Sequence, residues 1–191
     1  MARYLSGRGI ILLPVPPVLR WAPSLRRPDG TAAPAMVARI DGSDGALIGV
    51  QRTWLARGPT GQWRRRDRAM LARSAGGAVR LADAAEVVLI AEGVETTLSG
   101  MQATGMPGWA TLGTSGMVAL VLPPIVREVV ILADNDANGA GERAAYAAAA
   151  RWFAEGLRVR IAMPPDPGTD FADVLAGGAS APVADVRRDA A

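Results

Sequence analysis

The chain has 191 residues, half of them hydrophobic, and its 21 basic side chains stand against 18 acidic ones. Every basic residue is an arginine, and the chain contains no histidine, cysteine or lysine. These absences exclude Ser-His-Asp triads, cysteine nucleophiles, lysine Schiff bases, His or Cys zinc sites and Walker-type phosphate loops. Carboxylates, arginines, hydroxyls and amides remain, which favours carboxylates acting with a hard cation such as Mg²⁺.

The composition also bears on the cell compartment. A chain without cysteine fits a reducing environment, so we expect a cytoplasmic protein. The uncharged stretch 96–126 is interrupted by glycines and prolines, so it is interpreted as buried core and no membrane is expected as a partner. The apolar stretch Ile10–Val18 holds three prolines and lacks a small-residue cleavage site, which argues against a signal peptide.

Charge is divided unevenly along the chain. Residues 1–80 contain 14 arginines and 4 acids, whereas residues 81–191 contain 7 arginines and 14 acids. A polyanion-binding surface beside a carboxylate metal site would produce this division, because phosphates need arginine and divalent cations need clustered acids. The alternative is that both halves are simply solvated and attract each other across an interface.

The first half has the pattern of extended structure. Leu13–Pro17 is predicted to be an extended, polyproline-like segment, and a loop is predicted at 26–30. Ala35–Asp41 and Ala46–Leu55 are rich in strand-forming residues and are separated by Asp-Gly turn signals, which predicts a hairpin. The basic run 63–68 follows, either as a solvated loop or as a nucleic-acid-binding segment on the same ribbon.

The second half has the pattern of alternating strands and helices. Val87–Ala91 and Val129–Ala133 are short apolar runs typical of parallel strands buried on both faces. The remaining predicted elements are helices at 95–104, 115–121 and 139–155 and strands at 109–112 and 157–163. Such alternation predicts an α/β fold with a mostly parallel sheet and with functional groups at the carboxyl ends of its strands.

Acidic residues follow both buried strands. Glu92 comes directly after the first, and Asp134 and Asp136 come directly after the second. The carboxyl ends of parallel strands lie on one edge of a sheet, so these side chains are expected to converge on one or two hard cations. Gly93 and Gly139 are expected to permit unusual dihedral angles at the strand-to-helix junctions. The alternative is helix capping, which accounts for single acids such as Asp136 or Glu95 but not for three acids at two junctions.

These motifs resemble those of the Toprim domain, which is shared by bacterial-type primases, type IA and II topoisomerases and certain nucleases. The resembling residues are Glu92-Gly93-Val94-Glu95-Thr96 and Asp134-Asn135-Asp136-Ala137-Asn138-Gly139, within about residues 86–178. The segment 168–175 is similar to the Lys-Asp-x-Asn-Asp segment of phage and plasmid primases, with Thr169 in place of the Lys and Ala172 in place of the Asn, while Asp170 and Asp173 match.

The first half is similar to the segment that precedes Toprim in primase-like proteins of phages and plasmids. The resembling stretches are 4–10, 34–38, 49–55 and 76–81. The expected organisation is a basic, β-rich pre-Toprim segment (1–82), a Rossmann-like Toprim domain with helices on both sheet faces (83–180) and a disordered tail (181–191). Relatives commonly carry a zinc ribbon and sometimes a helicase domain, so this chain is expected to be a separate gene or a truncated form.

The resemblance implies Mg²⁺-dependent, or Mn²⁺-dependent, phosphoryl transfer on nucleic acid. Asp134, Asp136 and Asp170 would hold the metal, and Glu92 would be a metal ligand or the general acid/base, with Gly93, Glu95, Gly139 and Asp173 completing the motifs. The expected partners are single-stranded DNA, nucleoside triphosphates and a replicative helicase. The alternatives to a primase are a Toprim nuclease and a non-catalytic nucleic-acid-binding remnant.

The basic half would hold the template. The expected phosphate contacts are Arg52, Arg64, Arg65, Arg66, Arg68 and Arg80, and the expected stacking surfaces are Trp54 and Trp63. Trp21, Trp109 and Trp152 stand in apolar contexts and are expected in the core.

Overall fold

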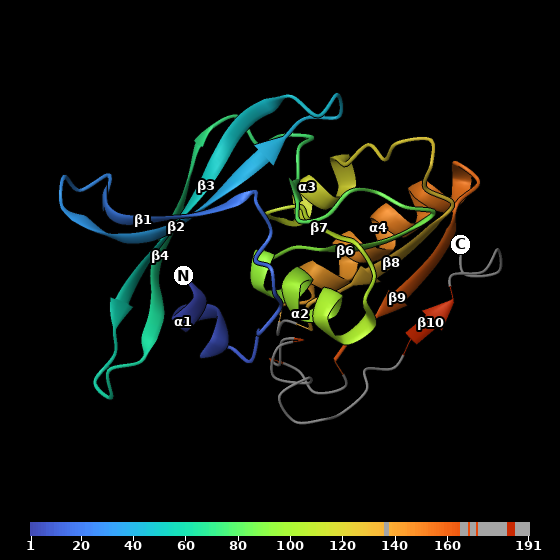
Figure 1. The fold of residues 1–191 in the computed structure, drawn as a ribbon. Coiled ribbons are helices and arrows are strands. Elements are labelled where there is room, and N and C mark those ends of the chain that lie inside the picture. Colours follow the sequence, from blue (N-terminus) through green and yellow to red (C-terminus); the bar gives the residue numbers. More distant parts are fainter. Residues whose placement is uncertain (136–137, 165–167, 169–170, 172–182, 186–191) are drawn as a thin grey trace.

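Two sheets organise the computed structural model, which describes residues 1–135, 138–164, 168, 171 and 183–185 (Figure 1). The first sheet is antiparallel with strand order β1-β2-β3-β4, and a short helix, α1, lies beside it. The bounds are α1 Ala2–Ser6, β1 Leu19–Arg26, β2 Ala32–Asp41, β3 Leu47–Arg57 and β4 Trp63–Ala72. The predicted hairpin is confirmed as β2 and β3, and the basic run forms β4 rather than a loop.

Alternate residues in the middle of β2 lie on the buried face of the first sheet. Met36, Ala38 and Ile40 of β2 are at most 1% exposed, as the period of two along a strand requires. The β2–β3 turn contains Gly45 with a φ of +78°, a left-handed conformation that favours glycine. Trp21 of β1 is 38% exposed, so its predicted place in the core is wrong.

The second sheet is mostly parallel, with strand order β10-β9-β8-β6-β7-β5. Its strands are β5 Val79–Arg80, β6 Val87–Ala91, β7 Gly108–Ala110, β8 Glu128–Leu132, β9 Arg158–Ala162 and β10 Val183–Asp185. The central strands β7, β6, β8 and β9 are parallel, and the edge strands β5 and β10 are antiparallel to their neighbours. The tail that was expected to be disordered therefore contains a strand, β10.

Helices cover both faces of this sheet, which confirms the predicted α/β architecture. The helices are α2 Val94–Thr104, α3 Thr114–Ala119 and α4 Ala140–Ala154. Val88 and Ile90 of β6 point to one face and pack in a cluster with Trp152 of α4. Leu89 points to the other face, where α2 approaches so closely that a Cβ at Gly100 would lie 2.7 Å from a Leu89 methyl carbon. None of the described helices is long and apolar enough to cross a membrane.

The two halves of the chain share one apolar core. Leu5 and Met36 of the first half pack in one cluster with Val94 and Leu98 of α2. In addition, β5 lies inside the segment predicted as pre-Toprim but pairs with β7 of the second sheet. The halves are therefore joined by hydrophobic packing and strand pairing.

Candidate active site

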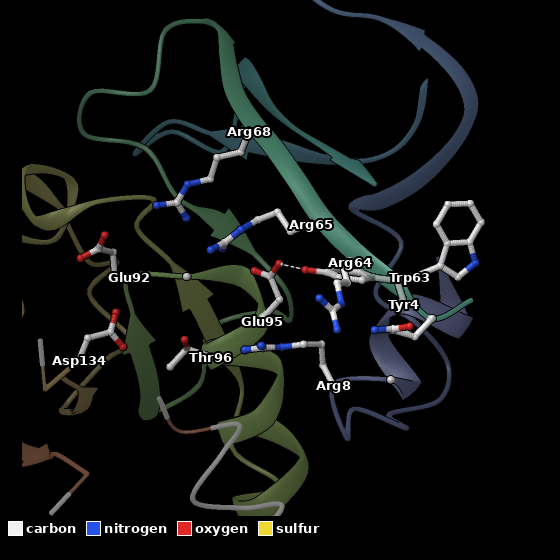
Figure 2. Close-up of a pocket in the computed structure, with 13 residues that line it drawn as sticks. Tyr4, Arg8, Trp63, Arg64, Arg65, Arg68, Glu92, Glu95, Thr96 and Asp134 are labelled. Carbon is white, nitrogen blue, oxygen red and sulfur yellow. Dashed lines mark hydrogen bonds between the residues drawn. The ribbon is translucent and has the colours of Figure 1, made fainter. Parts of the chain in front are cut away.

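A pocket of about 630 Å³ lies where the two halves meet at the carboxyl edge of the second sheet. Figure 2 shows Glu92 and Asp134 on one side of the pocket and the arginines on the other, with Glu95 among the arginines. The charged residues that line it are Glu92, Glu95, Asp134, Arg8, Arg64, Arg65 and Arg68. The structure thus brings together acids and arginines that lie in opposite halves of the sequence.

Glu92 follows β6 directly, and its backbone is held by the segment after β7. The Leu112 N–H donates a hydrogen bond to the Glu92 carbonyl at 2.8 Å, and the Thr111 N–H donates to the Ala91 carbonyl at 2.9 Å. Leu112 has a φ of +67°, a left-handed conformation that is costly for a residue with a branched side chain. This strained residue is hydrogen-bonded to the backbone of the predicted catalytic residue.

The two junction glycines differ from each other. Gly93 precedes α2 with φ −98° and ψ 148°, an extended conformation open to any residue, so the expectation of an unusual dihedral is wrong at this position. Gly139 precedes α4 with a φ of +65°, so the expectation is confirmed there.

Glu95 lies in the first turn of α2 and is 8% exposed. The buried Tyr4 hydroxyl of α1 donates a hydrogen bond to its Oε1 at 2.6 Å (Figure 2). Burial, the negative charge of Glu95 and this hydrogen bond raise the pKa of Tyr4 well above its ordinary value. Tyr4 therefore remains a hydrogen-bond donor at neutral pH, and it holds this carboxylate in the pocket wall.

Asp134 follows β8 at the same edge of the sheet and lines the pocket with Glu92. The first turn of α4 packs directly against it, because a Cβ at Gly141 would lie 2.7 Å from the Asp134 carbonyl oxygen. The chain returns to this edge after β9, since the Gly168 N–H donates to the Asn135 carbonyl at 2.7 Å. The three further predicted acids, Asp136, Asp170 and Asp173, lie outside the described residues.

Glu92 and Asp134 suit a hard divalent cation in type, because carboxylate oxygens are ligands that Mg²⁺ accepts and its remaining positions are often taken by water and phosphate. Within the described ranges, no group of three acidic side chains is arranged to hold a metal ion. The described residues therefore place two carboxylates in a pocket that is also lined by arginines able to take up phosphate charge.

The arginines of β4 owe their position to an irregularity in the strand. Arg68 pairs with Thr53 of β3 and Arg65 pairs with Leu55, so the register shifts between them. Thr53 and Leu55 point to the same face because they are two residues apart, and the shift brings Arg65 and Arg68 onto that face as well. In a regular strand, side chains three residues apart point to opposite faces. Figure 2 shows both guanidinium groups directed toward the carboxylate wall.

Four predicted contact residues lie outside the pocket lining: Arg52, Trp54, Arg66 and Arg80. Trp54 is only 1% exposed and its Nε1 donates to the Leu25 carbonyl at 3.0 Å, so its prediction as a stacking surface is wrong. The Arg52 guanidinium lies over the Trp54 ring at 5.0 Å and donates to the Met70 carbonyl. Arg66 forms an exposed ion pair with its neighbour Asp67 at 3.8 Å.

The Arg80 side chain contacts other parts of the protein. Its guanidinium lies 4.4 Å from the centre of the Trp109 ring and donates hydrogen bonds to the Gly42 and Ser43 carbonyls. It thereby connects the β2–β3 turn of the first sheet to β7 of the second. Trp109 and Trp152 are at most 1% exposed, which confirms their predicted place in the core.

Two pocket residues, Tyr4 and Arg8, were not among the predicted site residues. Both lie in the stretch 4–10, for which the sequence predicts only a resemblance to pre-Toprim segments. α1 has five residues and therefore shows no helical periodicity. A signal exists only for Arg8, which is the one charged residue in the stretch 4–10.

Comparison with known families covers nearly the whole chain. Residues 87–180 match the family described as the Toprim domain, and residues 1–81 match a Domain of unknown function (DUF7146). A comparison with curated protein sequences gives no significant match.

Solved primase structures have the same fold. A DNA primase domain from Pseudomonas aeruginosa is 18% identical with a TM-score of 0.55, covering 94% of this chain and 68% of that one. The Aquifex aeolicus primase, with its zinc-binding and RNA polymerase domains, is 18% identical with a TM-score of 0.57, covering 92% and 52%. A DnaG primase catalytic domain bound to ssDNA is 16% identical with a TM-score of 0.51, covering 83% and 55%.

This chain thus spans about half the length of the last two structures. The likeness to them concerns the fold, whereas the family match places the acidic motifs of the second half in a known domain. Residues 87–180 therefore match the Toprim domain family, and the two sheets of the chain are arranged as in DnaG-type primase domains.

Proposed function

We propose that the protein is a Mg²⁺-dependent nucleotidyltransferase of the primase type, which joins nucleotides on a single-stranded DNA template. One observation carries this proposal: the carboxylates Glu92 and Asp134 share a pocket with Arg8, Arg65 and Arg68. A nucleoside triphosphate with its cation needs both kinds of group, and about 630 Å³ lies within the usual range for small-molecule sites. Primase structures with this fold, one of them bound to ssDNA, support the choice of substrate.

In this mechanism the arginine wall binds the triphosphate. Arg8, Arg65 and Arg68 neutralise its phosphate oxygens and orient the α-phosphorus toward the 3′-hydroxyl of the growing strand. Glu92 accepts the proton of that hydroxyl while the 3′-oxygen bonds to the α-phosphorus and pyrophosphate leaves. Asp134 would hold Mg²⁺, together with the expected ligands Asp136 and Asp170, and the bound cation would neutralise the charge that develops on the phosphates.

We place the proposed activity in DNA replication. A primase acts on the single strand that unwinding exposes, so a replicative helicase is the macromolecular partner we expect. A phage or plasmid replication context follows from the resemblance of residues 4–10 and 168–175 to primases of such elements.

Primer synthesis tests the proposal directly. The protein is incubated with single-stranded DNA, labelled ribonucleotides and Mg²⁺ or Mn²⁺, in parallel with Glu92→Gln and Asp134→Asn variants. The matched control is Glu86→Gln, because Glu86 is an exposed acid just before β6, at the opposite end of that strand from Glu92. We expect oligonucleotide synthesis in the wild type and the control and a loss of at least about 100-fold in both site variants.

Other results assign other functions. Strand cleavage without nucleotides that depends on Glu92 would make the protein a Toprim nuclease. Binding of DNA without synthesis or cleavage, unchanged in both site variants, would make it a non-catalytic nucleic-acid-binding protein. If Mn²⁺ binding to the wild type is not weakened by Asp134→Asn, the carboxylates have a structural role only.

A further inference from the structure

A pair of tryptophan rings lies on the first sheet, next to the arginine wall of the pocket. Trp21 of β1 and Trp63 of β4 meet edge to face, with ring centres 6.0 Å apart and an interplanar angle of 76°. Trp21 is 38% exposed although it belongs to the largest apolar side-chain type. An exposed ring in the basic half of the chain offers a stacking face to a ligand that is both anionic and aromatic.

The pair is held in place by its surroundings. Trp63 packs against the cluster that contains Tyr4 and Leu5, and the Arg57 guanidinium lies 4.4 Å from the centre of its ring. Arg57 in turn donates a hydrogen bond to the Gly61 carbonyl. Rings that are already fixed lose little conformational freedom when a ligand stacks on them, which favours binding.

The pair is continuous with the proposed active site. Trp63 lines the pocket of the carboxylates and also a more open groove of about 500 Å³. Arg27, Arg57 and Arg66 line that groove, and no acidic side chain is among its described lining residues. In Figure 2 the Trp63 ring lies at the end of the arginine row, away from Glu92 and Asp134. A polyanion leaving the pocket along β4 therefore meets first arginines and then aromatic rings.

We propose that Trp21 and Trp63, with Arg57, form a stacking site for a base of the single-stranded template outside the pocket. This inference rests on the proposed function, because it takes the pocket as the place of chemistry. Bases of a single strand expose their faces to a ring, whereas those of a duplex stack on each other. Arginine beside the rings supplies contacts to the adjoining phosphates. The site therefore selects single strands through Trp21, the more open ring of the pair.

The test is the affinity of labelled oligo(dT) of about 16 nucleotides, measured by fluorescence anisotropy. One stacked base on an aromatic ring typically changes affinity by about tenfold, so we expect that loss in Trp21→Ala and a loss within about twofold in Trp21→Phe. The control is Tyr146→Ala, because Tyr146 is 50% exposed on α4 and belongs to the other half of the chain. Its affinity should equal that of the wild type.

A second measurement does not depend on the stability of the alanine variant. Stacking quenches indole fluorescence, so oligo(dT) should quench the wild type and should quench Trp21→Phe markedly less at saturation. Equal quenching in both proteins would overturn the stacking site. A blunt duplex should bind wild type and Trp21→Ala equally, and an equal loss for duplex and single strand would also overturn it.

The failures of the two proposals are distinguishable. If Arg65→Ala and Arg68→Ala weaken binding of oligo(dT) while Trp21→Ala does not, the stacking site is wrong and the arginine wall stands. If wild type binds no oligo(dT), both are wrong. If Trp21→Ala weakens binding but the Glu92→Gln variant synthesises primers normally, the stacking site stands and the proposed catalytic function is wrong.

Discussion

Replacing Tyr4 by phenylalanine tests the contact that joins α1 to the acidic wall. The change removes only the hydroxyl that donates to Glu95 at 2.6 Å, and it keeps the ring in the apolar cluster. Tyr4 is 3% exposed and Glu95 is 8% exposed, so this hydrogen bond is largely shielded from solvent. A hydrogen bond to a buried charged group contributes about 1.5–3 kcal/mol, so we expect the free energy of unfolding to decrease by about 2 kcal/mol.

Urea denaturation at pH 7 measures this loss as a lower midpoint with an unchanged slope. For a chain of this size the melting temperature should decrease by about 4–8 °C. Tyr146→Phe is the matched control, because Tyr146 is 50% exposed, and a surface change of this kind should cost no more than about 0.5 kcal/mol.

A double-mutant cycle separates the hydrogen bond from other effects of the change. Combining Tyr4→Phe with Glu95→Ala, which removes the acceptor, should cost less than the two single changes added together, by about 1 kcal/mol or more, because the contact can be lost only once. Two results would refute the reasoning: a cost of Tyr4→Phe below about 0.5 kcal/mol, or additivity of the two changes.

Three further predictions concern pH, packing and salt. The pKa of Tyr4 is raised in the folded protein, so ionisation of its hydroxyl disfavours folding. The stabilising contribution of Tyr4 is complete below its ordinary pKa of 10.0 and is lost as the pH rises above that value. The urea midpoints measured at about pH 9 and about pH 11 should therefore differ more in the wild type than in Tyr4→Phe. Gly141→Ala places a Cβ 2.7 Å from the Asp134 carbonyl oxygen, so we expect the free energy of unfolding to decrease by about 1–3 kcal/mol. Mn²⁺ binding, measured by calorimetry, should also become weaker, and an unchanged Mn²⁺ affinity would contradict the role given to this contact. Arg65→Ala and Arg68→Ala should each lower the slope of log affinity against log salt concentration by about 0.7 for single-stranded DNA, whereas an unchanged slope would show that the arginine does not contact phosphate.

The second sheet was the part of the fold most open to prediction. Val87–Ala91 is apolar on both faces and is bounded by charge, and the structure has a strand with the same bounds. Buried parallel strands allow few polar residues, so their limits are visible in the sequence. β1 was missed because Pro23 interrupts its pattern; the register of β1 shifts between Ala22 and Leu25, and proline is tolerated at such an irregularity on an edge strand.

The acidic wall of the site was more predictable than the basic wall. Glu92 and Asp134 follow parallel strands, whose carboxyl ends meet by the rules of sheet topology. Trp54 and Trp63 carry the same side chain on neighbouring strands, yet Trp54 lies on the internal strand β3 and is buried, while Trp63 lies at the start of the edge strand β4. Which face of β4 each arginine takes depends on a register shift, and a shift by one residue leaves no mark in the residue pattern.

The shared apolar core limits how such a chain can change. Leu5 and Met36 on one side and Leu98 on the other belong to one hydrophobic cluster, and β5 crosses into the second sheet. Consider a chimera in which residues 1–82 come from one relative and the remaining residues from another. The two sides of its shared hydrophobic core would then come from different proteins. The packing between these two sides would then determine the width of the pocket, because the pocket lies where the two halves meet. The two halves therefore depend on each other for one hydrophobic core, even though they match two separate families.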